Sequence, residues 1–177
     1  MAADEATATS PFWKFSLGLY ADPEVAKTCI ELQDGAGADV NVLLYMLWAA
    51  SRGRRLGIDD VREIVAAVED WRTGVVVPLR AARRSLRSPP GSIDDNLAAA
   101  LRRQVKKAEL EAERLQQEAL YRRRAVQDLG RAEPLLDVAA VANVEAYAGV
   151  VGREFSSAAI ETLLAALRRQ QTRGGAQ

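Results

Sequence analysis

The chain has 177 residues, of which 49% are hydrophobic and 27% are charged, a balance that predicts a globular domain with a sizeable core rather than a disordered chain. Lysine plus arginine and aspartate plus glutamate number 24 each, so the protein carries no net charge that would attract polyanions as a whole. Histidine is absent, which removes the commonest general acid or base and the commonest transition-metal ligand.

Cysteine usage and the N-terminal segment predict a cellular location. The single cysteine, Cys29, excludes an internal disulfide. The opening MAADEATATS has neither the basic nor the apolar stretch of a secretory signal, and no apolar run approaches the roughly 18–20 residues that span a bilayer. The sequence therefore predicts a cytoplasmic protein without membrane contact.

Two helix start signals open the chain. Ser10-Pro11 and Asp22-Pro23 each place a capping side chain before a proline, which fits the first position of a helix. These signals predict one helix from residue 11 to about residue 21. A second should begin at residue 23, with a buried face of Val25, Cys29 and Leu32.

The segment VNVLLYMLWAA, residues 40–50, is apolar or aromatic except for Asn41, and Asp39 precedes it as a cap. A helix that is apolar on every side must be covered on every side, and this one is too short to cross a membrane. We predict that residues 39–52 form the central helix of an all-α bundle, wrapped by the two helices before it and the two after it. Asn41 should help the cap or bridge to a neighbouring helix.

The next signals predict a helix from Asp59 to Trp71, followed by a break or kink at Gly74 and Pro78. Within that break, residues 74–77 (GVVV) are the only strand-like stretch. A basic helix with an apolar stripe then runs to about residue 88, and Pro89-Pro90-Gly91 predicts a linker.

A long helical pattern follows, with a capping-box spacing at Ser92 and no break before Gly130. Apolar residues alternate at spacings of three and four between positions 98 and 129, and Arg122 is the one exception. This heptad seam predicts a protruding arm or hairpin, and it offers a surface for a homodimer. Two packing helices should follow, opening at Pro134 and Ser156. The predicted organisation is a disordered tail (1–10), an N-terminal helical core (11–88), a linker (89–92), the long helix with two packing helices (93–171) and a second disordered tail (172–177).

The residues from Phe12 to Ala50 resemble the N-terminal signature of an uncharacterised proteobacterial family of small hypothetical proteins with a domain of unknown function. The shared pieces are FW-x-FS at 12–16, LQD at 32–34, Gly37, DVN at 39–41 and LW at 47–48, with weaker matches at Trp71 and 77–80. The resemblance covers about the first half of the chain. It implies an all-α fold and the bacterial cytosol, and it implies no activity.

Polar and aromatic residues gather around the start of the central helix. Residues 33–41 (QDGAGADVN) place two carboxylates and two amides at a helix N-terminus, which can hold an anion or a small polar ligand, although a capped turn is the simpler interpretation. Nearby aromatic side chains can line a pocket between helices or pack the core. The candidate ligand-binding residues are Trp13, Tyr20, Gln33, Asp34, Asp39, Asn41 and Trp48.

Residues 72–91 contain five arginines and no acidic residue. Such a basic face can dock an acidic partner, or it can be a solvated face paired with glutamates of the long helix. Neither a helix-turn-helix nor an aromatic–basic stacking pattern is present, which argues against nucleic-acid binding. The candidate partner-binding residues are Arg80, Arg83, Arg84 and Arg87.

Catalytic, metal and cofactor motifs are missing from the sequence. No histidine exists to activate Cys29, Glu-x-x-His pairs are absent, and no glycine-rich phosphate loop occurs, so we predict no catalytic residue, no metal site and no cofactor. The sequence favours a non-enzymatic adaptor, assembly or regulatory protein that contacts a protein partner. The alternatives are a small-molecule-binding protein or enzyme with a pocket near Asn41, and a nucleic-acid-associated protein using its arginines.

Overall fold

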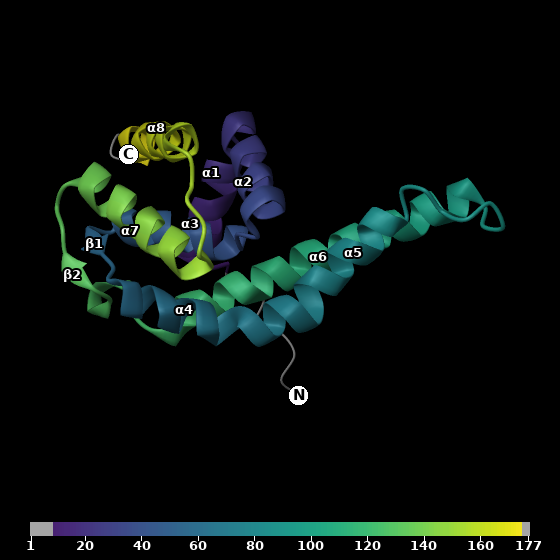
Figure 1. Cartoon of the computed structure of the whole chain (residues 1–177), viewed down its shortest axis with the longest axis horizontal. Helices are drawn as coiled ribbons and strands as arrows, with labels where there is room; N and C mark the ends of the chain where they lie inside the picture. The colour runs from purple at the N-terminus through teal and green to yellow at the C-terminus, as the bar shows by residue number, and fades with distance from the viewer. Residues whose placement is uncertain (1–8, 175–177) are drawn as a thin grey trace.

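The computed structural model describes residues 9–174, which form a helical body and one long projecting arm (Figure 1). The prediction of an all-α fold is confirmed, because two strands of two residues each are the only strands in this range. None of the helices in the described range is both long and apolar enough to cross a membrane. The predicted tails lie mainly outside the described residues, although Ser10 caps the first helix and the last helix continues to Gly174.

Helices α1 (Pro11–Tyr20) and α2 (Pro23–Ala36) begin where the proline signals predict. The Ser10 hydroxyl accepts a hydrogen bond from the Trp13 amide at 3.1 Å, and Asp22 accepts one from the Glu24 amide at 3.0 Å. Helix α2 ends at Gly37, whose φ of 71° lies in the left-handed region that favours glycine. Local capping chemistry therefore fixes both helices.

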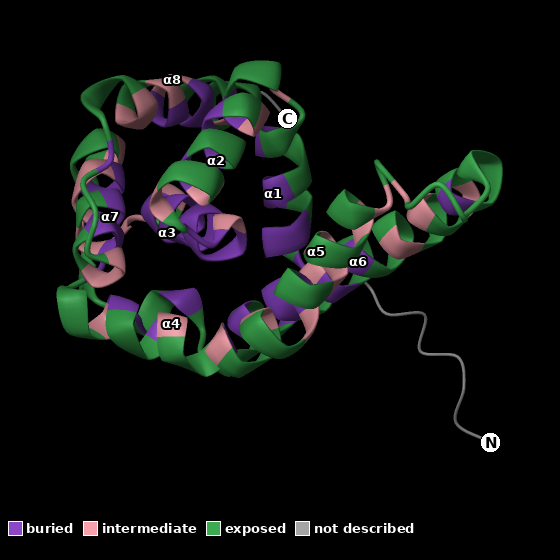
Figure 2. Ribbon diagram, turned by 45° about the vertical axis from the view of Figure 1, so that its right-hand side comes forward, coloured by how far each residue is buried: buried purple, intermediate pink, exposed green. Residues whose placement is uncertain are grey.

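Helix α3 (Val40–Ser51) is the centre of the body, as predicted, and every residue from Asn41 to Ala50 is buried. Figure 2 shows it inside a frame made by the other helices. The predicted cover is wrong in part. Helices α1, α2 and α8 (Ser157–Gly174) pack on α3. Its main neighbour is α7 (Leu136–Val151), with α6 (Asp95–Arg123) beside it, rather than the two helices that follow it in sequence. Alanine and valine predominate in α7, and these small side chains let the two helix axes approach closely.

Helix α4 (Ile58–Trp71) does not end at Gly74 or Pro78, so of the predicted break or kink the structure excludes only the break. It passes through one π-helical stretch, η1 (Arg72–Val76), directly into α5 (Val77–Ser85). Proline cannot donate a hydrogen bond to the preceding turn, and a wider π turn accommodates that loss without ending the helix. The strand-like residues 74–77 are therefore helical.

Helices α5 and α6 pack against one another and leave the body together (Figure 1). We call α5, residues 86–94 and the N-terminal half of α6 the arm. Asp94 caps α6, not Ser92, because its carboxylate accepts from the amides of Asn96 and Leu97. The helix ends at Arg123, seven residues before the predicted end, and is about 44 Å long from the rise per residue of an α-helix.

The predicted seam on α6 coincides only in part with its buried face. Ala98 and Ala112 are buried, but Leu101 and Leu115 are 49% and 43% exposed. The buried face instead includes polar side chains, namely Glu109, Gln116, Gln117 and Glu118. A pattern based on apolar residues alone therefore identifies only part of the buried face of this helix.

A small ribbon closes the end of the body opposite the arm. Strand β1 (Arg54–Arg55) pairs antiparallel with β2 (Arg131–Ala132), after a short 3₁₀ turn, η2 (Val126–Asp128). Gly130 has a φ of 48°, and a Cβ atom at this position would lie 2.2 Å from the Arg55 carbonyl oxygen, so only glycine fits.

Helix α8 (Ser157–Gly174) returns across the body. Within α7, the fully buried Asn143 joins three segments: its Oδ1 accepts from the Leu56 amide at 2.7 Å, and its Nδ2 donates to the carbonyls of Met46 and Arg54 at 3.1 and 3.0 Å. This side chain therefore ties α7 to α3 and to the ribbon, a role that the sequence did not indicate.

Candidate functional site

A relay of buried polar side chains connects the start of α3 to α6. Gln117 Nε2 donates to Asn41 Oδ1 at 2.8 Å, and Asn41 Nδ2 donates to Gln116 Oε1 at 3.2 Å. Gln116 Nε2 then donates to the Asp39 carboxylate at 2.5 Å. Asn41 thus bridges to a neighbouring helix, while the cap itself is made by Asp39, which accepts from the Asn41 amide at 2.9 Å.

Asp39, at the end of this relay, is held from two further sides. Its amide donates to the Tyr147 hydroxyl at 2.6 Å, and burial together with the nearby Asp39 charge raises the pKa of Tyr147, so the hydroxyl stays protonated. Arg72 donates to the Gly37 carbonyl at 3.1 Å and lies 3.7 Å from the Asp39 carboxylate. Residues from α3, α6, α7 and η1 therefore fix the polar groups at this point.

A cavity of about 130 Å³ lies on the other side of the relay, where the arm joins the body. Helices α1, α2, α3 and α6 all line it, and we call it the elbow pocket. Its walls are largely apolar, and polar groups from α1, α3 and α6 are set among them. The lining residues are Trp13, Ser16, Leu17, Tyr20, Gln33, Val40, Asn41, Leu44, Leu110, Glu113 and Gln117.

Two buried polar atoms in residues of this lining have no hydrogen-bond partner within the described chain. They are the Ser16 hydroxyl oxygen and Gln117 Oε1, in side chains that are 2% and 3% exposed. A buried polar atom without a partner costs about 1–3 kcal/mol. Both atoms belong to residues that line the elbow pocket but are themselves closed off from solvent, so a molecule bound in the pocket reaches them through a small rotation of the two side chains.

Four of the seven predicted ligand-binding residues line the elbow pocket: Trp13, Tyr20, Gln33 and Asn41. Asp39 lies behind it, in the relay.

The other two lie elsewhere. Asp34 is exposed and forms an ion pair with Arg84 at 2.7 Å. Trp48 packs in the core against Phe15, with ring centroids 5.3 Å apart.

Sequence reasoning missed the contribution of α6 to the pocket, namely Leu110, Glu113 and Gln117. These residues lie about sixty positions after the central helix. The adjacent pair Gln116-Gln117, inside a long helical pattern, is the one signal in the sequence that a polar contact would be buried there.

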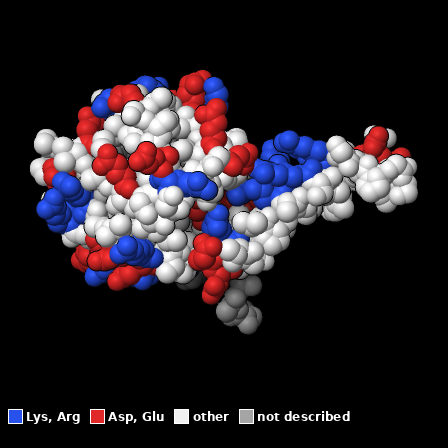
Figure 3. All heavy atoms as spheres, viewed as in Figure 1, with Lys and Arg blue, Asp and Glu red and all other residues white. Residues whose placement is uncertain are grey.

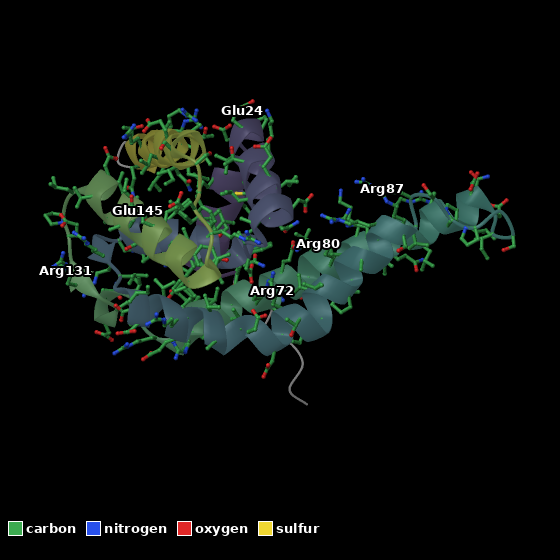
Figure 4. The ribbon with its side chains drawn as sticks, in the orientation of Figure 1. Glu24, Arg72, Arg80, Arg87, Arg131 and Glu145 are labelled. Carbon is green, nitrogen blue, oxygen red and sulfur yellow. The ribbon has the colours of Figure 1, made fainter. Side chains whose placement is uncertain are left out.

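Of the predicted partner-binding arginines, Arg80 and Arg83 lie between the two helices of the arm, whereas Arg84 and Arg87 are exposed. Arg80 donates to Glu109 and Glu113 at 3.1 and 2.6 Å, and Arg83 forms a short ion pair with Glu109. Arg84 reaches Asp34 of α2. Arg80 thus lies at the base of the arm, and Arg87 lies farther out along it (Figure 4).

Opposite environments act on the two glutamates of this cluster. Burial tends to raise the pKa of Glu109, but hydrogen bonds from Arg83 and Arg80 outweigh it and hold the pKa below its ordinary value. Burial dominates at Glu113 and raises its pKa despite the contact with Arg80. Glu113 is therefore a half-buried carboxylate, 26% exposed, whose charge Arg80 compensates only in part, and it lines the elbow pocket.

Cys29 and the acidic residues show no arrangement for nucleophilic or metal chemistry. Burial raises the pKa of the Cys29 thiol to about 12, which keeps it unreactive near neutral pH. Among the described residues, no group of three or more cysteines and carboxylates is placed to hold a metal ion.

A second hollow, of about 760 Å³, lies between the ribbon and α7. Its charged lining residues carry both signs, for example Arg55, Arg131, Asp60 and Glu145, and all of them are exposed or half-buried. An open hollow of mixed charge defines no ligand as sharply as the elbow pocket does.

Comparison with protein families matches residues 11–120 to the family described as Protein of unknown function (DUF2390). The match spans more than half of the chain. The chain belongs to the DUF2390 family. Every residue that lines the elbow pocket, and the whole arm, lies in the part matched to DUF2390, whereas α7 and α8 follow it. Comparisons with curated proteins and with solved structures gave no match.

Proposed function

We propose that this member of the DUF2390 family is a non-enzymatic adaptor or assembly protein that binds an acidic protein partner with its arm. The observation that carries this proposal is the charge of the arm. Residues 84–107 hold six cationic and two acidic side chains, a net charge of +4 in a chain whose total is zero. Figure 3 shows cationic side chains gathered on this face of the arm where it leaves the body.

Most of these cations have no internal role. Arg84 pairs with Asp34, but the other five form no ion pair with any described residue. They are Arg87, Arg102, Arg103, Lys106 and Lys107. Unpaired cations on a projecting surface attract an acidic surface and raise its rate of association.

Apolar side chains near the end of the arm add a second type of contact. Ile93, Leu97 and Leu101 are 51%, 70% and 49% exposed, and no residue of α5 is fully buried. Apolar groups bordered by charge are typical of surfaces that bind another protein.

We also propose a cytoplasmic location, because the lone cysteine is a buried free thiol.

The test places a photo-reactive amino acid at Leu97 on the arm or at Ala158 on α8, in the full chain, and exposes native cell extract to light. We expect one discrete protein adduct from position 97 and none from position 158. The captured protein is then purified, and its affinity for the unmodified chain is measured at several salt concentrations.

A matched pair of double variants tests the charge. Lys106→Glu with Lys107→Glu should weaken binding at least tenfold, whereas Lys14→Glu with Arg153→Glu, which change two exposed cations of the body, should leave it unchanged. An affinity for the partner that changes neither with salt concentration nor with Lys106→Glu and Lys107→Glu would contradict the proposal. An adduct to a second copy of the chain, or to nucleic acid, would replace it with a homodimer through residues 98–129 or with nucleic-acid binding.

A further inference from the structure

We propose that the elbow pocket binds a small organic amine, whose apolar part packs against Trp13 and Leu44 and whose ammonium group donates hydrogen bonds to Gln117, Ser16 and Glu113. This inference goes beyond the proposed function and does not depend on it, because the pocket is formed by the body and the base of the arm.

The direction of the polar relay determines what Gln117 presents to the cavity. The Asp39 carboxylate only accepts hydrogen bonds, so Gln116 must donate its amide nitrogen to it and keep its oxygen for Asn41. Asn41 therefore accepts from the Gln117 nitrogen. Gln117 is left with a buried oxygen that accepts no hydrogen bond from any described residue, so it can accept one from a ligand.

Two further acceptors line the same cavity. The Ser16 hydroxyl is buried and has no partner within the described chain, and its oxygen can accept a hydrogen bond. Glu113 contributes a carboxylate that accepts one bond from Arg80 and has capacity for more. An ammonium group has three donors and no acceptor, which is complementary to this set.

Charge favours a cation over a neutral donor. Burial raises the pKa of Glu113, which means that its negative charge is poorly compensated in the folded protein. A bound ammonium would supply the missing positive charge. The aromatic residues Trp13 and Tyr20 also line the pocket, and aromatic rings attract cations.

The volume limits the size of the ligand. A cavity of about 130 Å³ is slightly smaller than the engineered cavity of about 150 Å³ that holds benzene. The enclosed part of the ligand is therefore no larger than one ring or a short branched chain, since the cavity is only partly open, and nucleotides and other large metabolites are excluded.

The test titrates the full-length protein with benzylamine and isobutylamine, and with the matched neutral probes benzyl alcohol and toluene, followed by calorimetry and by amide chemical shifts in NMR spectra. We expect at least one amine to bind with a dissociation constant below about 1 mM, and at least tenfold more tightly than the alcohol or the hydrocarbon. The shifts should appear at residues of α1, α3 and α6 around the cavity.

Variants separate recognition from packing. Ser16→Ala and Gln117→Leu should each weaken amine binding about tenfold or more, while Gln104→Leu, an exposed change on the same helix as Gln117, should leave it unchanged. Ser16→Ala removes only the unpaired hydroxyl, so it keeps the test valid if Gln117→Leu fails to fold.

Absence of binding at 10 mM of both amines would overturn the inference and leave a cavity filled by water. Toluene binding as tightly as benzylamine would also overturn it, because the cavity would then be a simple apolar void. The partner-binding variant Lys106→Glu with Lys107→Glu should retain amine binding, so failure of one proposal is distinct from failure of the other.

Discussion

Replacing Glu109 by glutamine tests whether the ion-pair cluster at the base of the arm stabilises the fold. The Glu109 side chain is 7% exposed and contacts Arg80 and Arg83, which are 16% and 19% exposed. Breaking a fully buried ion pair costs about 3–5 kcal/mol, and exposed pairs contribute about 0–1 kcal/mol. Because water still reaches both guanidinium groups, we expect Glu109→Gln to lower the free energy of unfolding by about 2 kcal/mol.

Urea unfolding at a series of pH values measures this difference and checks its electrostatic origin. The folded-state pKa of Glu109 lies below its ordinary value of 4.5, so its ionised form stabilises the fold above that pH. The stabilisation is lost as the pH falls through the folded-state pKa, and the glutamine variant has no such titration. The difference between the two proteins should therefore be widest at about pH 5–8, narrow as the pH falls below 4.5, and close only below the folded-state pKa.

Glu111→Gln is the matched control, since Glu111 is on the same helix and pairs with Arg114, but its side chain is 54% exposed. We expect a loss of no more than about 0.5 kcal/mol for this change. The reasoning fails if the two variants lose equal stability, or if the deficit of Glu109→Gln persists at a pH where Glu109 is protonated.

Three further changes test other contacts through urea unfolding. Glu113→Gln should leave the free energy of unfolding at pH 7 unchanged or raise it by up to about 1 kcal/mol. Burial raises the pKa of Glu113, so above that pKa its ionised form destabilises the folded state. A clear decrease in the free energy of unfolding would contradict this sign. Gly130→Ala should lower the free energy of unfolding by about 2 kcal/mol or more, since the new methyl group meets the ribbon backbone. The matched change Gly74→Ala, in an open helical position, should raise it by up to about 1 kcal/mol. Equal effects of the two changes would refute the steric argument. Asn143→Ala removes three hydrogen bonds of the interior and should lower the free energy of unfolding by about 3–4 kcal/mol, with faster amide hydrogen exchange at Leu56. A loss below 1 kcal/mol would show that water replaces the side chain.

Local features of the sequence predicted the start of the fold well. The caps at Ser10, Asp22 and Asp39 act on amides within three residues, so their effect can be read without knowing the fold. The burial of Asn41–Ala50 followed from composition, because no face of that segment tolerates water. Composition does not say which helix provides the cover, and α7 lies almost a hundred residues later.

Long-range features escaped prediction for a physical reason. The buried face of α6 carries Glu109, Gln116 and Gln117, and each is satisfied, wholly or partly, by a partner far away in sequence. A pattern based on apolar residues reads such a face as solvent-exposed. The same reason applies to the elbow pocket, where four of the eight lining residues on α1–α3 were predicted and none of the three on α6.

The C-terminal helices carry a consequence for any shortened form of the protein. The family match ends at residue 120, but α7 lies against α3 and supplies both Tyr147 and Asn143. A fragment cut at the end of the match would expose the most apolar helix of the chain and leave its first turn without a hydroxyl partner. The boundary of family similarity is thus not the boundary of the unit that folds, and expression of the family region alone would yield an aggregating polypeptide.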